Sequence, residues 1–243
     1  MTLLKNKTAI VYGAAGPVGA AVAAAFAREG ARVALTGRTQ PALAEVADRI
    51  RAAGGNVETA VVDALDKSAV RAHADKFAAA AGGIDIAFNA TSNDDLQGIP
   101  LLDMDFADFA RPVSKVIATH FNIATVTARH MTVRGGVILA LGGGREAIPR
   151  LGGSHVAWSA LAGLCRQLAS ELGASRIRVA WLLSPGSPDP GSPESGDPVA
   201  DEMLLGRRPS YQDVANVAVF AASDWAATMT ATEINLTGGS VID

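Results

Sequence analysis

The chain of 243 residues carries a formal net charge of −3, and 49% of its residues are hydrophobic but only 5% are aromatic. This length suits one α/β domain, and the composition predicts a core built mainly from Ala, Val, Leu and Ile, as in helices packed on a parallel sheet. The small negative charge gives no electrostatic reason to expect nucleic acid or an anionic membrane as a partner.

The first predicted elements surround a glycine-rich turn. An apolar strand over residues 7–12 runs into Gly13, Gly16 and Gly19, and a helix follows over residues 18–29. Gly13 would make the turn, Gly16 would let a phosphate approach the helix N-terminus, and Gly19 would let the helix pack on the sheet. The same glycines also fit a plain tight turn, but the strand before them and the strand after the helix favour a dinucleotide-binding site.

The end of the second strand, predicted over residues 31–36, indicates the type of dinucleotide. An NAD-selective site would place an Asp or Glu there, on the ribose hydroxyls, and this chain has none. Arg38 offers a planar, permanently charged group that suits a 2′-phosphate, with Thr36 and Thr39 as added hydroxyl donors. The plainer alternative is that Arg38 is a solvated charge at a strand end. The pattern favours NADP(H) over NAD(H).

Strand-like and helix-like segments alternate to the end of the chain. This alternation predicts a Rossmann-type, doubly wound fold, in which helices cover both faces of a seven-stranded parallel sheet in a single domain over residues 1–243. The further strands are predicted over residues 56–62, 84–89, 135–141, 177–183 and 232–236, and the further helices over residues 40–53, 67–81, 103–131, 155–173 and 210–222. Residues 184–202 are rich in Pro, Gly and Ser, and we expect a mobile loop on the substrate side.

Six short motifs occur in the order found in one enzyme family. They are the turn Gly13 to Gly19, Val61-Val62-Asp63, Ile84-Asp85-Ile86-Ala87-Phe88-Asn89-Ala90, Leu164-Cys165-Arg166-Gln167-Leu168-Ala169, Pro185-Gly186 and Ile234-Asn235-Leu236-Thr237-Gly238-Gly239. Together they resemble the short-chain dehydrogenase/reductase family over nearly the whole chain. The resemblance implies an oxidoreductase that transfers a hydride between a nicotinamide cofactor and a carbonyl or alcohol.

The resemblance also implies contacts to the cofactor beyond the glycine turn. It assigns the adenine to Asp63 and further cofactor contacts to Asn89, Pro185 and Gly186. The chain departs from the family's pattern at Pro17, where typical small members carry glycine, and in the Asn-Asn-Ala-Gly motif, of which only Asn89 is kept. Proline is tolerated at a first helical position, so the phosphate site is expected to remain.

The residues that carry the family's chemistry are missing. That chemistry uses a Tyr as general acid, a Lys four residues later, a Ser, and often an Asn. Aligned on Leu164 to Ala169, the corresponding positions hold Ser154 for Tyr, Trp158 for Lys, Gly142 or Gly143 for Ser, and Val116 or a close neighbour for Asn. The only tyrosines are Tyr12 and Tyr211, and neither begins a Tyr-x-x-x-Lys pair. The resemblance therefore predicts a divergent member without the Asn/Ser/Tyr/Lys tetrad.

Two neighbouring residues are the candidates for catalysis. A serine hydroxyl is a far weaker acid than a phenol of pKa about 10, so Ser154 would act best by holding a water. The imidazole of His155, titrating near pH about 6.5, suits acid–base work, although a lone His at a helix start is more often a cap or a surface group. His120 and Lys115 are weaker candidates on the preceding helix, over residues 103–131.

Three functions stay open. The first is an NADP(H)-dependent reductase with a substituted proton donor, which the family favours. The second is a cofactor-binding protein without hydride transfer, either a pseudoenzyme or the inactive partner of an active homologue. The third is a non-redox lyase or cyclase.

Trp158 and Gly143 are assigned to the substrate pocket, where Trp158 would stack on the substrate or, equally, pack in a helix interface.

Partners and location follow less directly. The resemblance implies a homo-oligomer, a dimer or tetramer in which the helices over residues 103–131 and 155–173 pair across a two-fold axis. Cys165 is expected to be buried and structural. We recognise no signal peptide and no apolar run of the roughly 18 residues that span a bilayer, so a cytoplasmic location is expected. No metal site is predicted, and the small-molecule substrate is not identified.

Overall fold

The computed structural model describes residues 2–144, 146–184 and 203–242. These residues form a sheet of seven parallel strands in the order β3-β2-β1-β4-β5-β6-β7. The strands are β1 (Thr8–Tyr12), β2 (Arg32–Gly37), β3 (Asn56–Val61), β4 (Ile86–Asn89), β5 (Gly136–Gly142), β6 (Ile177–Leu183) and β7 (Thr232–Asn235). The α-helices are α1 (Pro17–Arg28), α2 (Gln40–Ala52), α3 (Lys67–Ala81), α4 (Phe106–Thr127), α5 (Ser154–Leu172) and α6 (Tyr211–Ala222).

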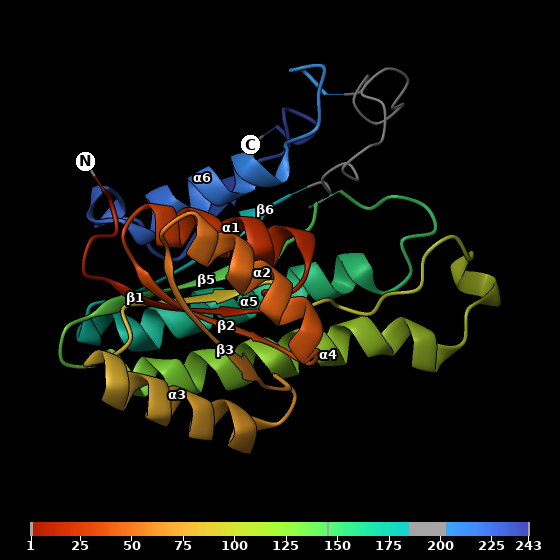
Figure 1. The fold of residues 1–243 in the computed structure, drawn as a ribbon. Helices are drawn as coiled ribbons and strands as arrows, with labels where there is room; N and C mark the ends of the chain where they lie inside the picture. Colours follow the sequence, from red (N-terminus) through yellow and green to blue (C-terminus); the bar gives the residue numbers. More distant parts are fainter. Residues whose placement is uncertain (1, 145, 185–202, 243) are drawn as a thin grey trace.

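Helices cover both faces of the sheet (Figure 1). Helices α1, α2 and α6 pack on one face and α3, α4 and α5 on the other, and each group encloses its own apolar core. Successive strand residues point into alternate cores: Val11 and Phe88 lie in the first, Ile10 and Ala87 in the second. Because both faces are buried at the centre of the sheet, β1, β4, β5 and β6 are largely apolar, whereas the edge strands β3 and β7 carry polar residues and are only partly buried. The predicted fold class is confirmed.

Helix α4 is shorter than the helix predicted over residues 103–131. A separate 3₁₀ turn, Leu101–Asp103, precedes it, and the extended backbone of Met104 and Asp105 keeps the two apart. At its other end the α-helix gives way to a second 3₁₀ turn, Ala128–His130. The apolar periodicity runs on through these turns, so the sequence pattern alone does not mark the change of hydrogen bonding. In the described part of the chain, no helix combines the length and apolar character needed to cross a membrane.

The strand order reverses beside β1. The chain builds outward from β1 to β2 and β3, then crosses back so that β4 pairs with the free side of β1. The loops that follow β1 and β4 therefore leave the sheet toward opposite faces, and a crevice opens between them at the carboxyl ends of the strands. Ligands of open α/β sheets bind in such crevices.

Helix α6 begins with a capping box whose strength depends on pH. Asp213 Oδ2 accepts hydrogen bonds from Arg207 Nη1 at 2.7 Å and from the Ser210 backbone N–H at 2.8 Å, while the Asp213 N–H donates to Ser210 Oγ at 3.1 Å. The hydrogen bonds from Arg207 and Ser210 lower the pKa of Asp213 from 3.8 to about 2. A carboxyl with a lowered folded-state pKa stabilises the fold above its unfolded pKa, and this stabilisation is lost as the pH falls toward 2.

We expect Asp213→Asn to lower the midpoint of thermal unfolding by roughly 2–4 °C at pH 7, because a neutral amide replaces the charged carboxylate of the capping box. The difference from wild type should shrink between about pH 4 and pH 2, as the wild-type carboxyl takes up its proton. Circular dichroism melts at both ends of that range would measure it. Asp48→Asn, which removes a carboxylate from an exposed pair with Arg51 on α2, is the control. If the difference in unfolding midpoint between wild type and Asp213→Asn stayed constant with pH, the expectation would be wrong.

Candidate active site

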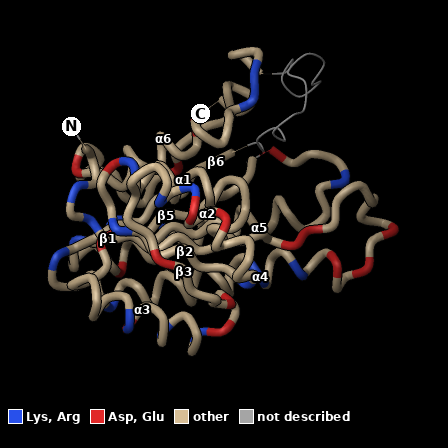
Figure 2. Tube along the Cα trace, viewed as in Figure 1, with Lys and Arg blue, Asp and Glu red and all other residues tan. Residues whose placement is uncertain are grey.

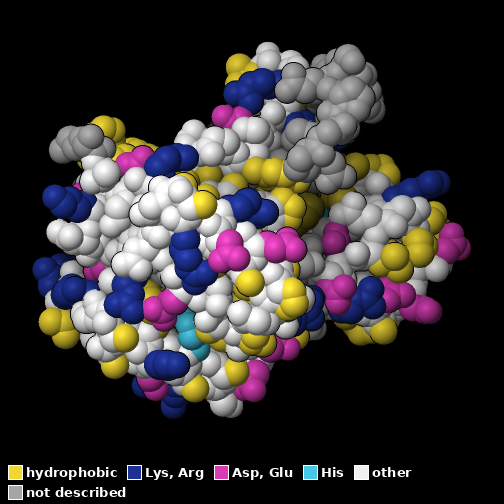
Figure 3. Space-filling model, viewed as in Figure 1, with side chains coloured by type: hydrophobic (Ala, Val, Ile, Leu, Met, Phe, Trp, Pro, Cys, Tyr) yellow, Lys and Arg dark blue, Asp and Glu magenta, His cyan; other side chains and the backbone are white. Residues whose placement is uncertain are grey.

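A cavity of about 1010 Å³ lies in the crevice at the carboxyl ends of β1, β2, β4 and β5. Hydrophobic side chains gather in the hollow at this edge of the sheet in the space-filling view (Figure 3). The volume is at the upper end of ordinary ligand sites, so the cavity has room for a dinucleotide together with a small substrate. One end is lined by the glycine turn and the segments after β2 and β3. The other, which we call the substrate end, is lined by the segments after β4 and β5 and by α4 and α5.

The glycine turn supplies an uncapped helix N-terminus to the cavity. Gly13 has φ +76°, which favours glycine, and a Cβ there would collide with the backbone of Ala90. Helix α1 starts at Pro17 with Gly16 as its N-cap, and its first turn has neither a side-chain cap nor an acidic residue. A Cβ at Gly19 would collide with the carbonyl of Gly13, so the helix packs directly on the turn. The free N–H groups and the positive end of the helix dipole thus suit a pyrophosphate.

The segments after β2 and β3 bring Arg38, Thr39 and Asp63 to the same end of the cavity. Arg38 is exposed and forms no ion pair with any residue that the structure describes. One carboxylate oxygen of Asp63 accepts the Leu65 N–H at 3.0 Å. Thr36 is different from what the sequence indicated: it is fully buried, and its hydroxyl donates to the Val11 carbonyl at 3.1 Å. The sheet, not a ligand, uses that hydroxyl.

Asn89 does not line the cavity. It ends β4 with its side chain buried, and its carbonyl oxygen accepts hydrogen bonds from the N–H of Thr91 at 3.0 Å and the hydroxyl of Thr91 at 2.8 Å. Thr91 itself lines the cavity. In this structure Asn89 shapes the loop after β4, and its cofactor contact stays a prediction. Pro185 and Gly186 lie outside the described residues.

Behind Asn89, a buried histidine contacts the single cysteine. His120 is fully buried, with Nδ1 3.4 Å from Asn89 Nδ2 and Nε2 3.5 Å from Cys165 Sγ. Burial lowers the pKa of His120 to about 4 and raises the pKa of Cys165 to about 12. The imidazole is therefore neutral at neutral pH and the thiol is protonated. Both groups belong to the core, as predicted for Cys165.

The two predicted catalytic residues begin α5, and neither lines the cavity. Ser154 is fully buried, and its hydroxyl donates to Asp95 Oδ2 at 2.5 Å. Gln97 Nε2 donates to the same oxygen at 2.5 Å. His155 follows Ser154, with Nδ1 buried and without a hydrogen-bond partner in the described structure. Asp95 and Gln97 of this cluster line the cavity, and the carboxylate of Asp95 is its charged group there.

Sequence reasoning missed Asp95 and Gln97. They lie on the irregular segment between β4 and α4, which carries no recognised motif. A weak signal was present, because this segment and the start of α4 hold five acidic residues, seen as a run of red positions in Figure 2. Its place after a strand next to the reversal of strand order could have singled it out.

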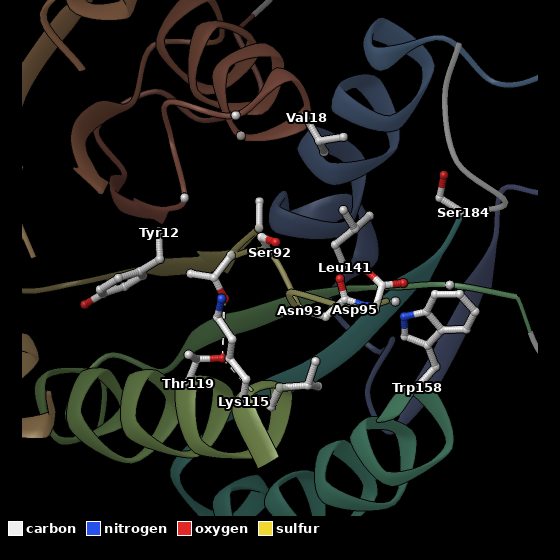
Figure 4. A pocket seen from close by; sticks show the side chains of 18 of the residues that line it. Tyr12, Val18, Ser92, Asn93, Asp95, Lys115, Thr119, Leu141, Trp158 and Ser184 are labelled. Atoms are coloured by element: carbon white, nitrogen blue, oxygen red, sulfur yellow. Dashed lines mark hydrogen bonds between the residues drawn. The ribbon is translucent and has the colours of Figure 1, made fainter. Parts of the chain in front are cut away.

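Trp158 and Gly143 form a matched pair at the substrate end. Trp158 lies one helical turn after Ser154 on α5 and points into the cavity (Figure 4). The indole packs against Gly143 at the end of β5, so closely that a Cβ on that glycine would collide with the ring. The absence of a side chain at position 143 is thus what makes room for Trp158.

Lys115 enters the substrate end from α4 (Figure 4). Its side chain is only 13% exposed, and Nζ lies 3.5 Å from Asp94 Oδ2. The carboxylate of Asp94 therefore lies beside this lysine, and it also lies 4.0 Å from Arg111 Nε. Within the described ranges, no group of three or more His, Cys, Asp or Glu residues is placed to hold a metal ion.

Comparisons with known proteins agree with this geometry. A family model described as enoyl-(acyl carrier protein) reductase matches residues 13–240. A short-chain type dehydrogenase/reductase, y4mP of Sinorhizobium fredii, is 30% identical over 99% of this chain and 99% of its own length. Among solved structures, a dehydrogenase/reductase from Sinorhizobium meliloti 1021 has a TM-score of 0.88 at 29% identity, covering 98% of this chain and 96% of its own.

A second solved structure shows what one such protein binds. The 7α-hydroxysteroid dehydrogenase complexed with NADH and 7-oxo glycochenodeoxycholic acid has a TM-score of 0.86 at 27% identity, covering 99% of this chain and 96% of its own. These relatives are oxidoreductases by name, and they do not favour the inactive or the lyase alternative. The chain belongs to the short-chain dehydrogenase/reductase family.

Proposed function

We propose that this protein is an NADP(H)-dependent oxidoreductase whose active site lacks the family's Tyr and Lys. The observation that carries the proposal is Arg38, an exposed guanidinium without an ion-pair partner among the described residues, at the end of the cavity that holds the uncapped N-terminus of α1. A free guanidinium fits a 2′-phosphate in a planar, charge-assisted geometry. The dinucleotide, when bound, would supply the hydride.

The cavity residues fit such a cofactor along its whole length. The first turn of α1 would bind the pyrophosphate, and Asp63 would face the adenine end. Trp158 occupies the α5 position of the family's Lys and would cover the nicotinamide end. The solved hydroxysteroid dehydrogenase is complexed with NADH, so the preference for NADP(H) here depends on Arg38 and not on that relative.

A calorimetric titration of the purified protein with NADPH and then NADH tests this function. We expect NADPH to bind with a micromolar dissociation constant and NADH at least about 10-fold more weakly, because only NADPH carries the phosphate that Arg38 would pair. Equal affinities would contradict the assignment of Arg38. Failure of both cofactors to bind would contradict the proposed function as a whole.

The predicted dimer or tetramer and the predicted cytoplasmic location stay predictions. Helices α4 and α5, which the family resemblance pairs across a two-fold axis, lie on the same face of the sheet and expose Phe121 and Val156. Exposed apolar side chains of this kind are compatible with an interface between copies.

A further inference from the structure

The substrate end of the cavity presents a carboxylate close to where the family's alignment would place a phenol. Ser154, at the Tyr position, is too short to reach the cavity, and it donates its hydroxyl proton to Asp95. Of the two tyrosines, Tyr12 points its hydroxyl away from the cavity into the core (Figure 4), and Tyr211 begins α6. No phenol in the described structure is therefore available to a substrate held beside α5.

Asp95 is held in place so that one oxygen remains available. Both Ser154 and Gln97 donate to Oδ2, whereas Oδ1 accepts no hydrogen bond from a described residue. Trp158 lies one turn after Ser154 on the same face of α5, so its indole and the carboxylate face the same part of the cavity (Figure 4). A carboxylate only accepts hydrogen bonds and attracts positive charge, and an indole face also attracts cations.

The surrounding charges favour a cation as well. Among the described residues that line the substrate end, Asp95 and Glu146 are acids and Lys115 is the base. Asp94 pairs with Lys115 at 3.5 Å, so the lysine's charge is already opposed. Asp94 does not itself line the cavity and also lies 4.0 Å from Arg111, so the lining of the substrate end carries two acids, Asp95 and Glu146, and one base. Such a site would repel the negative charge that develops on a carbonyl oxygen during hydride addition.

A carbonyl group and a protonated imine, as acceptors of hydride, need different groups from the protein. Hydride addition to a neutral C=O bond leaves an alkoxide, which requires a proton donor. Hydride addition to a protonated C=N bond forms a C–H bond, turns the π pair into the nitrogen lone pair and leaves a neutral amine. The imine is reduced, the dinucleotide is oxidised, and no proton moves in that step. A site with a carboxylate and without a phenol suits the second reaction.

We propose that the substrate is a protonated imine, an iminium ion, whose N–H is held by the carboxylate of Asp95 and whose charge is covered by Trp158. Ser154 and Gln97 act as positioning residues for that carboxylate. This inference rests on the proposed hydride transfer, and it names the substrate class for the same cavity.

The test compares two substrates of similar shape with NADPH. We expect 2-methyl-1-pyrroline to be reduced with a kcat/KM at least about 100-fold above that of cyclopentanone. Both rates are measured from the loss of NADPH absorbance. A binding readout without turnover accompanies it: with NADP⁺ present, calorimetry should show that protonated 2-methylpyrrolidine binds at least about 10-fold more tightly than neutral cyclopentanol.

Asp95→Asn assigns these effects to the carboxylate. We expect it to weaken binding of the ammonium ligand at least about 10-fold and to lower kcat/KM for the imine about 100-fold, with NADPH affinity unchanged. The amide can still accept the hydrogen bonds from Ser154 and Gln97, so the fold should persist, and a thermal melt checks this. The matched control is Asp103→Asn, an exposed acid on the same segment that does not line the cavity.

The outcomes separate the inference from the proposed function. If NADPH binds but the ketone is reduced as well as the imine, or the ammonium ligand binds no more tightly than the alcohol, the imine inference is wrong and the oxidoreductase proposal stands. If Asp95→Asn unfolds, the wild-type comparison of ammonium and alcohol decides alone. If NADPH does not bind, both proposals are wrong.

Discussion

Arg38→Glu is expected to weaken NADPH binding about 100-fold while changing NADH affinity no more than a few-fold. The substitution removes the charge-assisted hydrogen bonds to the 2′-phosphate and puts a repelling carboxylate in their place. NADH has hydroxyl groups at that point, and a carboxylate can accept hydrogen bonds from them. Calorimetric titrations of both cofactors measure the two affinities on the same preparation.

The control for Arg38→Glu makes the same change of charge away from the cavity. Arg49 is exposed near the end of α2 and does not line the cavity, so Arg49→Glu should leave both affinities as they are. If Arg38→Glu reduced the two affinities equally, Arg38 would have no part in choosing between the cofactors. An equal loss for Arg49→Glu would instead indicate a general effect of net charge.

The second large effect is expected from Gly143→Ser, which places a serine at one of the two positions, Gly142 or Gly143, that align with the family's Ser. The new side chain would collide with the indole of Trp158, and overpacking of this kind costs about 1–3 kcal/mol. For a chain of this length the unfolding midpoint should fall by roughly 2–10 °C. The collision is with the indole of Trp158 alone. The double variant Gly143→Ser/Trp158→Lys should therefore lose much less stability than the sum of the losses of the two single variants.

A double-mutant cycle measured by thermal or denaturant unfolding tests this coupling. The neighbouring variant Gly144→Ser is the control, since a Cβ at that position meets no atom within 4 Å. Additive losses of stability in the cycle would mean that the indole of Trp158 moves aside freely, and that a side chain at position 143 does not exclude it. Strong coupling would show that a side chain at position 143 and the indole at position 158 exclude one another.

Much of the fold follows from local sequence, because the central strands are buried on both faces and form nearly continuous apolar runs between helical segments. The ends of α4 did not follow, since the pattern of apolar residues continues through the flanking 3₁₀ turns, Leu101–Asp103 and Ala128–His130. Helix type depends there on one or two backbone torsions, which the order of apolar residues does not encode.

The candidate site was predictable where it depends on backbone and not where it depends on distant side chains. Gly13, Gly16 and Arg38 lie on the turns after β1 and β2, and strand–turn–helix spacing suffices to place them. The contact of Thr36 with Val11 lies between strands, and that of Asp95 with Ser154 joins segments 59 residues apart. Neither contact leaves a local pattern, so the acidic run after β4 and its place beside the reversal of strand order were the signals for Asp95.

The reversal of strand order beside β1 also affects the nascent chain. β1 lies in the middle of the finished sheet, between β2 and β4, and Ala9 pairs with Ile86 across that junction. During synthesis at about 5–20 residues per second, β4 follows β1 after roughly 4–15 s. Until then β1, buried along its whole length in the native protein, has one edge open, and an open apolar edge is where chains aggregate. The strand order that creates the crevice therefore gives each new chain several seconds of exposure before its central strand is protected.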